Sequence, residues 1–216
     1  MPDYTIQRLN MVESQVRTND VTDRRIQEAM REIPRERFVP AGKCAIAYAD
    51  MAVEVVPGRF LLDPRTFSKL VQLAEIAPAD RILDVGCASG YSTAVLDRLG
   101  GEVTGLEEDA ELIRIASDAL PSAGAKARVV QGKLTEGYSA GAPYDVIFIN
   151  GAVERVPDAL QAQLGEGGRL VTVIETGRQG RAHLLVREHG RIGRRADFDA
   201  SVPLLPGFRQ PAAFVF

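Results

Sequence analysis

The stretch ILDVGCASGYSTA, residues 82–94, decides the fold of this 216-residue chain. It is an apolar segment interrupted by Asp84, followed by glycines at Gly86 and Gly90 and then by residues that suit a helix. A strand that turns through glycines into a helix is typical of α/β folds that bind nucleotides, where free N–H groups at the helix start receive an anion. Ala88 stands where a dinucleotide loop has its middle glycine, and Asp84 would repel a pyrophosphate. The loop therefore favours a ligand with cationic groups.

Short apolar strands alternate with amphipathic helices from this loop onward, which predicts an α/β fold with a Rossmann-like, doubly wound, mostly parallel sheet and helices on both faces. The end of the chain differs, because 183–198 reads as two strands joined at His189-Gly190 and AAFVF as a short terminal strand. Antiparallel C-terminal strands are therefore expected. The expected strands are 81–85, 102–106, 127–130, 146–149 and 169–174, and the expected helices are 91–99, 110–120 and 154–164.

An N-terminal helical extension, residues 1–76, is expected to precede the core, residues 77–216, within a single domain of 1–216. Apolar residues at near-helical spacing indicate a helix over 4–17. Thr22 is the expected N-cap of a second helix that ends before Pro34.

The remainder of the extension contains one further helix signal. Residues 34–60 are expected to be irregular, because they are rich in small residues and punctuated by prolines. Asp63 as an N-cap and Pro64 at the first helical position then predict a helix that runs to about Ile76.

Composition excludes several classes of function. The chain is 45% hydrophobic and 25% charged with a net charge of −3, which gives no general reason to expect nucleic acid or an acidic membrane as partner. Its two cysteines, Cys44 and Cys87, have no CxxC or histidine cluster nearby, so we expect neither a disulfide nor a metal site. No signal peptide is recognisable, and no apolar run approaches the ~20 residues of a membrane span. A cytoplasmic location is expected.

Glu107 ends the second strand of the core, seventeen residues after Gly90. An acid at this place can accept hydrogen bonds from both hydroxyls of a ribose, so loop and acid together predict an adenosine-type cofactor. S-adenosylmethionine combines a sulfonium and an ammonium, which suit Asp84, with a carboxylate for the loop N–H groups. A nicotinamide cofactor, and with it an oxidoreductase, remains the alternative that the generic loop allows.

DVGCASGY is similar to the loop D/E-x-G-x-G-x-G of class I S-adenosylmethionine-dependent methyltransferases. Four ordered blocks extend the likeness over nearly the full chain: MVESQVRTNDVTDRRIQEAMREIPRERFVP (11–40), ILDVGCASGYSTAVL (82–96), PYDVIFINGAVERVP (143–157) and LQAQLGEGGRLVTVI (160–174), with SVPL (201–204) near the end. In their order and spacing these blocks resemble the protein-L-isoaspartate O-methyltransferase family within that class.

The resemblance implies methyl transfer from S-adenosylmethionine to the carboxylate of isoaspartyl residues in a damaged protein or peptide substrate. It places the methionine part at the loop and the ribose at Glu107. The adenine would lie by Gly132 and Lys133, where the family has a Gly-Asp pair and backbone groups of Lys133 or Leu134 must serve instead. The cofactor-binding residues implied in this way are Asp84, Gly86, Cys87, Ala88, Gly90, Glu107, Gly132, Lys133, Leu134 and Asn150.

The segment GRFLLDP, residues 58–64, departs from the family, which has a polar run close to GQTISQP there. The hydroxyl thought to position the acceptor carboxylate is absent, and a leucine cannot donate a hydrogen bond. No catalytic residue is assigned. Arg59, through charge-assisted bonds to a carboxylate, and Asn150, at the tip of the fourth core strand, are the acceptor-side candidates. A relative that binds the cofactor but methylates another acceptor, or none, is the alternative. The oligomeric state is left open.

Overall fold

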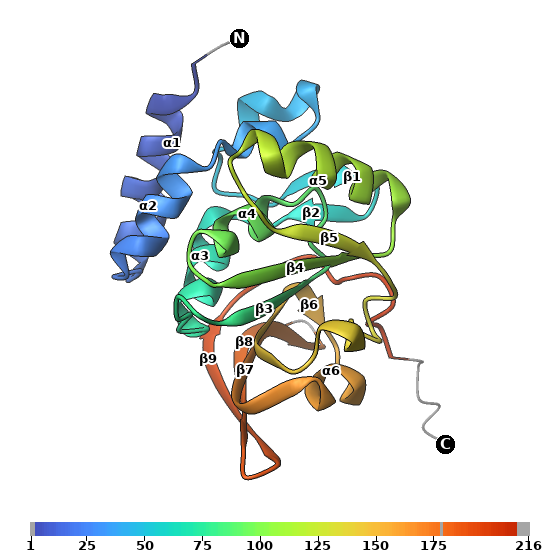
Figure 1. The fold of residues 1–216 in the computed structure, drawn as a ribbon. Helices are drawn as coiled ribbons and strands as arrows, with labels where there is room; N and C mark the ends of the chain where they lie inside the picture. The colour runs from blue at the N-terminus through green and yellow to red at the C-terminus, as the bar shows by residue number, and fades with distance from the viewer. Residues whose placement is uncertain (1–2, 178, 211–216) are drawn as a thin grey trace.

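A computed structural model of the chain describes residues 3–177 and 179–210, and a seven-stranded sheet forms its centre (Figure 1). The strand order is β5-β4-β3-β6-β7-β8-β9; the first five are parallel, and β8 and β9 are antiparallel additions at one edge. The predicted sheet and its antiparallel end are confirmed, and the terminal strand expected at 212–216 lies outside the described residues. The strands are β3 Arg81–Val85, β4 Glu102–Glu107, β5 Arg128–Gln131, β6 Tyr144–Val153, β7 Leu164–Thr176, β8 Gln179–Glu188 and β9 Arg191–Asp199.

Helices cover both faces of the sheet, as expected. Neighbouring strand residues point to opposite faces, so Ile82 packs in the hydrophobic cluster of α3, α4 and α5, while Leu83 packs in the cluster that includes Leu160 of α6. Burying each such side chain contributes roughly 1.5–3 kcal/mol. No helix among the described residues has both the length and the apolar character to cross a membrane. The helices that cover the sheet are α3 Pro64–Leu73, α4 Tyr91–Asp97, α5 Ala110–Ser122 and α6 Asp158–Ala162.

Helix α6 is shorter than the predicted helix over 154–164. Pro157 is its N-cap, and the residue before a proline is held in extended conformation, so the helix cannot begin earlier. At the other end, Leu164 already belongs to β7 and pairs with Tyr144 of β6. On the second face, Leu205 and Phe208 of the C-terminal segment therefore join Leu160 of α6 in the hydrophobic cluster.

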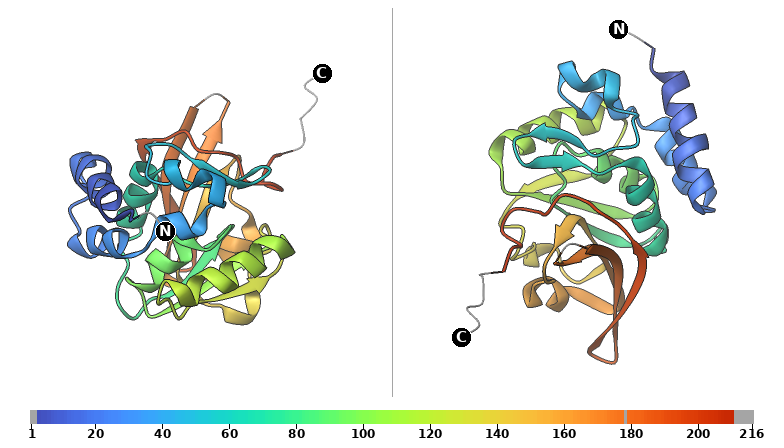
Figure 2. Two further views of the ribbon diagram at one scale, coloured as in Figure 1. Left: turned by 90° about the horizontal axis from the view of Figure 1, so that it is seen from above. Right: turned by 180° about the vertical axis from the view of Figure 1, so that it is seen from behind.

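The N-terminal helices pack beside α3 on the first face (Figure 2). The helix predicted over 4–17 is α1 Thr5–Met11 continued by a π-helical segment, Val12–Val16. The second predicted helix is α2 Arg24–Glu32, but its N-cap is Asp23 and not Thr22. The Asp23 side chain accepts a hydrogen bond from the Arg25 N–H, while the Thr22 N–H donates to Gln72 of α3.

A β-hairpin over 53–61 begins within residues 34–60, where the sequence suggested irregular structure. Two 3₁₀ segments, Arg35–Phe38 and Ala41–Ile46, precede strands β1 Val53–Val56 and β2 Arg59–Leu61. The strands pair antiparallel across Pro57-Gly58, and Gly58 has a φ of 76°, which glycine adopts without strain. The alternation in VEVV, with every second residue buried, was a usable strand signal that the surrounding prolines concealed.

Helix α3 starts at Asp63 and Pro64, as predicted. The Asp63 side chain accepts a hydrogen bond of 2.7 Å from the Thr66 N–H, and Pro64 occupies the first turn. The helix ends at Leu73, earlier than the expected Ile76, because Glu75 has a φ of 47° and so leaves the helical conformation.

Asp63→Ala is expected to destabilise the protein by about 1 kcal/mol, because an N–H at the helix start loses its acceptor. The measurement is the free energy of unfolding from urea denaturation. Asp50→Ala is the matched control, because Asp50 is exposed and makes no side-chain hydrogen bond or ion pair to another described residue. Equal stability of the two variants would contradict the capping role.

Candidate functional site

The glycine loop between β3 and α4 is a tight backbone structure. Gly86, Ala88 and Gly90 all have positive φ values, of 77°, 50° and 94°. The N–H groups of Gly86 and Cys87 donate to the Leu106 carbonyl of β4, at 2.9 and 3.4 Å. The loop is therefore fixed to the neighbouring strand, at the end of the sheet where both strands finish.

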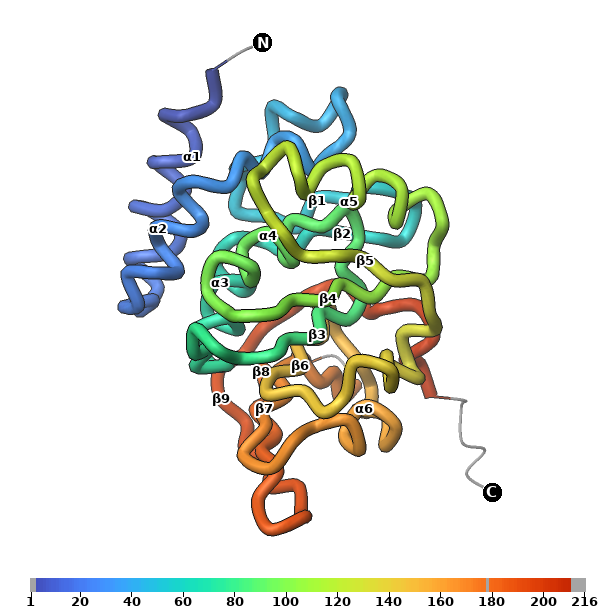
Figure 3. Tube along the Cα trace, viewed as in Figure 1, coloured from blue at the N-terminus to red at the C-terminus, as the bar shows by residue number. Residues whose placement is uncertain are grey.

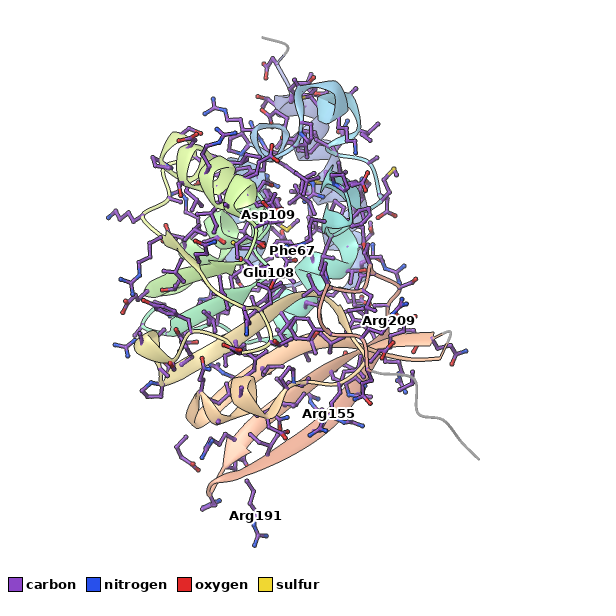
Figure 4. The ribbon with its side chains drawn as sticks, turned by 90° about the vertical axis from the view of Figure 1, so that its right-hand side faces the viewer. Phe67, Glu108, Asp109, Arg155, Arg191 and Arg209 are labelled. Atoms are coloured by element: carbon purple, nitrogen blue, oxygen red, sulfur yellow. The ribbon has the colours of Figure 1, made fainter. Side chains whose placement is uncertain are left out.

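The Glu107 carboxylate is fully buried at the end of β4. It accepts hydrogen bonds from three backbone N–H groups, at 3.0 Å from Ala88 in the loop, 2.8 Å from Glu108 and 3.2 Å from Asp109. Figure 4 looks onto this part of the molecule, with Glu108 and Asp109 labelled near its centre. Loop and acid, which the sequence predicted to act together, are thus in direct contact.

Arg59 of β2 forms a bidentate ion pair with Glu107. Its Nη1 and Nη2 lie 2.6 and 2.5 Å from the two carboxylate oxygens, and Arg59 is itself buried, with 5% exposure. A Cβ placed on Gly86 would lie 3.5 Å from Arg59 Nη2, so the guanidinium rests against the loop. The sequence suggested that Arg59 binds the acceptor. In the structure Arg59 instead contacts Glu107, the residue predicted to bind the ribose.

Asp84 lies behind the loop and is fully buried. Its Oδ2 accepts hydrogen bonds from Ser92 Oγ at 2.6 Å and Thr93 Oγ1 at 2.7 Å, and Asn150 Nδ2 donates to Ser92 Oγ at 2.7 Å. Asp84 and Asn150 are therefore joined through one hydroxyl. The Oδ1 atoms of both side chains are buried and have no hydrogen-bond partner among the described residues.

The other predicted cofactor-binding residues are Cys87 in the loop and residues 132–134 at the end of β5. Cys87 is buried in the loop, and burial raises the pKa of its thiol well above the ordinary value, so it stays protonated and contributes bulk. The Gly132 N–H donates to the Glu107 carbonyl at 3.0 Å, which places the end of β5 beside the acid. Lys133 turns outward to an exposed ion pair with Glu136, while Leu134 is buried in the core.

A C-terminal segment also reaches the loop, which the sequence did not reveal. Leu204 bridges to Ala152 of β6, and a Cβ on Gly86 or Gly151 would lie only 3.0 or 2.6 Å from the Leu205 side chain. Figure 3 shows the hairpin β1–β2 (cyan) and this segment (red) both arriving at this end of the sheet. SVPL was noted only as a family likeness, and nothing in it pointed to a contact with Gly86.

No group of three or more His, Cys, Asp or Glu side chains suited to a metal ion occurs among residues 3–177 and 179–210. The many cations of the β8–β9 hairpin lie elsewhere: Arg191 sits at its tip, far from Glu108 in Figure 4. The polar centre of the site therefore consists of Glu107, Arg59, Asp84 and Asn150.

Asp84 makes the stability of the protein depend on pH. Burial raises its pKa from 3.8 to about 6, against the lowering effect of the Ser92 and Thr93 hydroxyls, and the nearby Glu107 charge raises it further. The folded state therefore binds this proton more tightly than the unfolded state. Ionisation of Asp84 therefore costs stability as the pH rises from about 4 to about 6, by about 3 kcal/mol at 1.36 kcal/mol per pH unit.

Asp84→Asn is expected to remove this contribution, because the amide does not ionise. The free energy of unfolding should be measured by urea denaturation at about pH 4 and about pH 7 for both proteins. The difference in stability between variant and wild type should shift in favour of the variant by up to about 3 kcal/mol over that range. An unchanged difference would show that Asp84 is not a buried ionising group.

Comparison with known sequences gives a consistent result. The family model for protein-L-isoaspartate(D-aspartate) O-methyltransferase (PCMT) matches residues 7–202. A protein-L-isoaspartate O-methyltransferase of Koribacter versatilis is 35% identical over 204 residues, which are 94% of this chain and 92% of that one. One from Methylorubrum extorquens is 32% identical over 216 aligned residues, covering 96% of this chain and 92% of its relative.

Solved structures show the same fold. A protein-L-isoaspartate O-methyltransferase superposes with a TM-score of 0.80 and 24% identity, over 93% of this chain and 66% of the other. A Plasmodium falciparum structure, described as a putative protein-L-isoaspartate O-methyltransferase in complex with S-adenosyl-L-homocysteine, gives a TM-score of 0.79 at 19% identity, over 92% and 97%. With a family match over most of its length and relatives above 30% identity, the chain belongs to the protein-L-isoaspartate (D-aspartate) O-methyltransferase family.

Proposed function

We propose that the protein transfers a methyl group from S-adenosylmethionine to the carboxylate of isoaspartyl residues in damaged proteins. The observation that carries this proposal is the contact between the glycine loop and Glu107 in a chain of this family. The loop and the acid occupy the carboxyl ends of adjacent parallel strands, where open α/β sheets bind their ligands. The relatives' names support the reaction, and the contact between loop and acid supports this end of the sheet as the donor site.

The residues present fit S-adenosylmethionine. In this proposal Glu107 receives the ribose hydroxyls, and Gly132, Lys133 and Leu134 at the end of β5 border the adenine. The backbone from Gly86 to Gly90 borders the methionine part. When bound, the cofactor supplies a methyl group on a cationic sulfonium.

Two buried acceptors suit the ammonium of that ligand in particular. The Oδ1 atoms of Asp84 and Asn150 have no partner among the described residues, and a buried polar atom without a partner costs free energy. A donor cation beside them would satisfy both. Asp84 then acts from behind the loop, as a fixed negative charge, and Asn150 serves the donor as well as facing the acceptor side.

The acceptor needs alignment more than acid–base help, because a carboxylate is already ionised at pH 7. In GRFLLDP the apolar residues have a structural explanation: Leu61 and Leu62 are buried core residues, with 1% and 3% exposure. Arg59 is the one cation of that segment, and a guanidinium can hold a carboxylate through two charge-assisted bonds. We therefore assign the positioning of the acceptor to Arg59.

The same proposal treats residues 1–76 as an extension that completes the site of the 77–216 core, since Arg59 comes from the extension. The substrate is a protein or peptide, and neither nucleic acid nor membrane has a part in the reaction. The cytoplasm is the compartment we infer, because a reducing environment suits two free cysteines.

The alternative is a relative that binds the cofactor without esterifying isoaspartate. The pairing of Arg59 with Glu107, in place of a free hydroxyl in this segment, is the observation that favours it. The two functions differ in turnover, not in cofactor binding.

Incubation with methyl-labelled S-adenosylmethionine and an isoaspartyl peptide is expected to give a base-labile methyl ester. The same peptide with ordinary aspartate is the control for acceptor specificity, and Glu107→Gln should lower the rate at limiting cofactor at least about tenfold, because the ribose loses a charged acceptor. Wild type and Glu107→Gln should show the same far-ultraviolet circular dichroism.

Absence of ester with the isoaspartyl peptide would refute the proposed reaction. Calorimetry then separates what remains. Binding of S-adenosylhomocysteine without turnover on carboxylate, amine or hydroxyl acceptors would establish the alternative, whereas binding of NAD and not of S-adenosylhomocysteine would establish the oxidoreductase reading of the loop.

A further inference from the structure

The carboxylate of Glu107 has no free hydrogen-bonding capacity. Its Oε1 accepts from Arg59 Nη1 and from the N–H groups of Glu108 and Asp109, and its Oε2 accepts from Arg59 Nη2 and the Ala88 N–H. A carboxylate offers about four lone-pair sites. Two ribose hydroxyls can therefore be accepted only after the two bonds from Arg59 have been given up.

Among these five bonds, those from Arg59 are the ones that can be released. The three N–H donors belong to the loop and to the turn after β4, which are fixed by the backbone. The Arg59 side chain extends from a three-residue strand beside the Gly58 turn, and the neighbouring Leu61 is anchored in the core. The guanidinium can leave Glu107 by side-chain rotation, with the hairpin backbone in place.

Leu205 covers the loop from a second direction but is held more firmly. The backbone bonds Ala152 N–H to Pro203 carbonyl and Leu205 N–H to Ala152 carbonyl are both 2.9 Å long. Moving the segment that carries Leu205 would break these backbone hydrogen bonds to β6. Moving the Arg59 guanidinium would break only hydrogen bonds made by its own side chain. Arg59 is therefore the part of the cover that opens most easily.

We propose that Arg59 is a latch that exchanges one carboxylate for another. It closes the site by pairing with Glu107, and when ribose hydroxyls take Glu107 the released guanidinium pairs with the carboxylate of the acceptor. This inference rests on the proposed function and adds the order of events to it. A buried guanidinium is stable only with a partner, so its release creates a carboxylate-binding group at the moment the donor is in place.

The position of Arg59 supports this exchange. Its Nη2 lies against the Gly86 position of the loop, so a short rotation keeps the guanidinium beside the cofactor site. The planar guanidinium of Arg59 forms a bidentate pair with Glu107, and the same geometry suits any other carboxylate. Donor and acceptor binding are therefore coupled, and each raises the affinity for the other.

Calorimetry with S-adenosylhomocysteine tests the latch through binding alone. Arg59→Met should bind this probe at least about tenfold more tightly than wild type, because no ion pair has to be broken. The ligand-free variant should also melt at a lower temperature than wild type, because Glu107 is left buried without its counter-cation, and saturating probe should narrow that gap.

Two further variants complete the experiment. Arg59→Gln keeps an amide donor to Glu107, so it preserves more of the fold, and it should lie between wild type and Arg59→Met in affinity. Arg169→Met is the matched control, because Arg169 pairs with Asp80 at 2.6 Å in a partly buried site away from the loop. Loss of this ion pair should lower the stability of the protein without raising its affinity for S-adenosylhomocysteine.

The acceptor provides an independent readout. Arg59→Met should raise the KM for an isoaspartyl peptide at least about tenfold at saturating cofactor, while the affinity for the probe rises, and these opposite changes are the signature of the exchange. Equal or weaker probe binding by Arg59→Met, with wild type binding well, would overturn the latch and leave the proposed function intact. Failure of wild type and both Arg59 variants to bind the probe would overturn the two together.

Discussion

A carboxylate buried at the end of β4 is the constraint on which the site depends. Glu107 has no contact with solvent, and an ionised carboxylate in that position is tolerated only when its oxygens are paired and hydrogen-bonded. The structure meets this demand with one backbone N–H group from the loop, two from the turn after β4, and the guanidinium of Arg59. One side chain thereby ties together the hairpin of the extension, the glycine loop and the second strand of the core.

Strand pairing in the sheet brings the residues of the site together, independently of the contacts that they make with one another. Parallel pairing of β3 with β4 and with β6 brings Gly86, Glu107 and Asn150 to the carboxyl end of these strands. The hydroxyls at the start of α4 then fix Asp84 beneath the loop, where burial raises its pKa. The end of β4 is bordered by the rigid glycine loop and covered by the movable side chain of Arg59. Such an arrangement is suited to a ligand that must be enclosed before it reacts.

The core of the fold was readable from the sequence because the α/β signal is strong there: β3 was predicted residue for residue, and the loop and its partner acid were paired correctly. The hairpin β1–β2 was missed, because its strands have four and three residues and are bordered by prolines. The hydrogen-bond partners of Asp84 were not predicted, because Ser92 and Thr93 are local hydroxyls that read as ordinary helix residues. The contacts of Arg59 and Leu205 depend on which segments the fold brings over the loop, and sequence spacing carries no such information.

A crystal structure of the complex with S-adenosylhomocysteine would show directly whether Arg59 releases Glu107. We expect the ribose hydroxyls to donate to Glu107, and the Arg59 guanidinium to have left that carboxylate while remaining beside the loop. A complex in which Arg59 still holds Glu107 in a bidentate pair, with the ribose bound elsewhere, would contradict it.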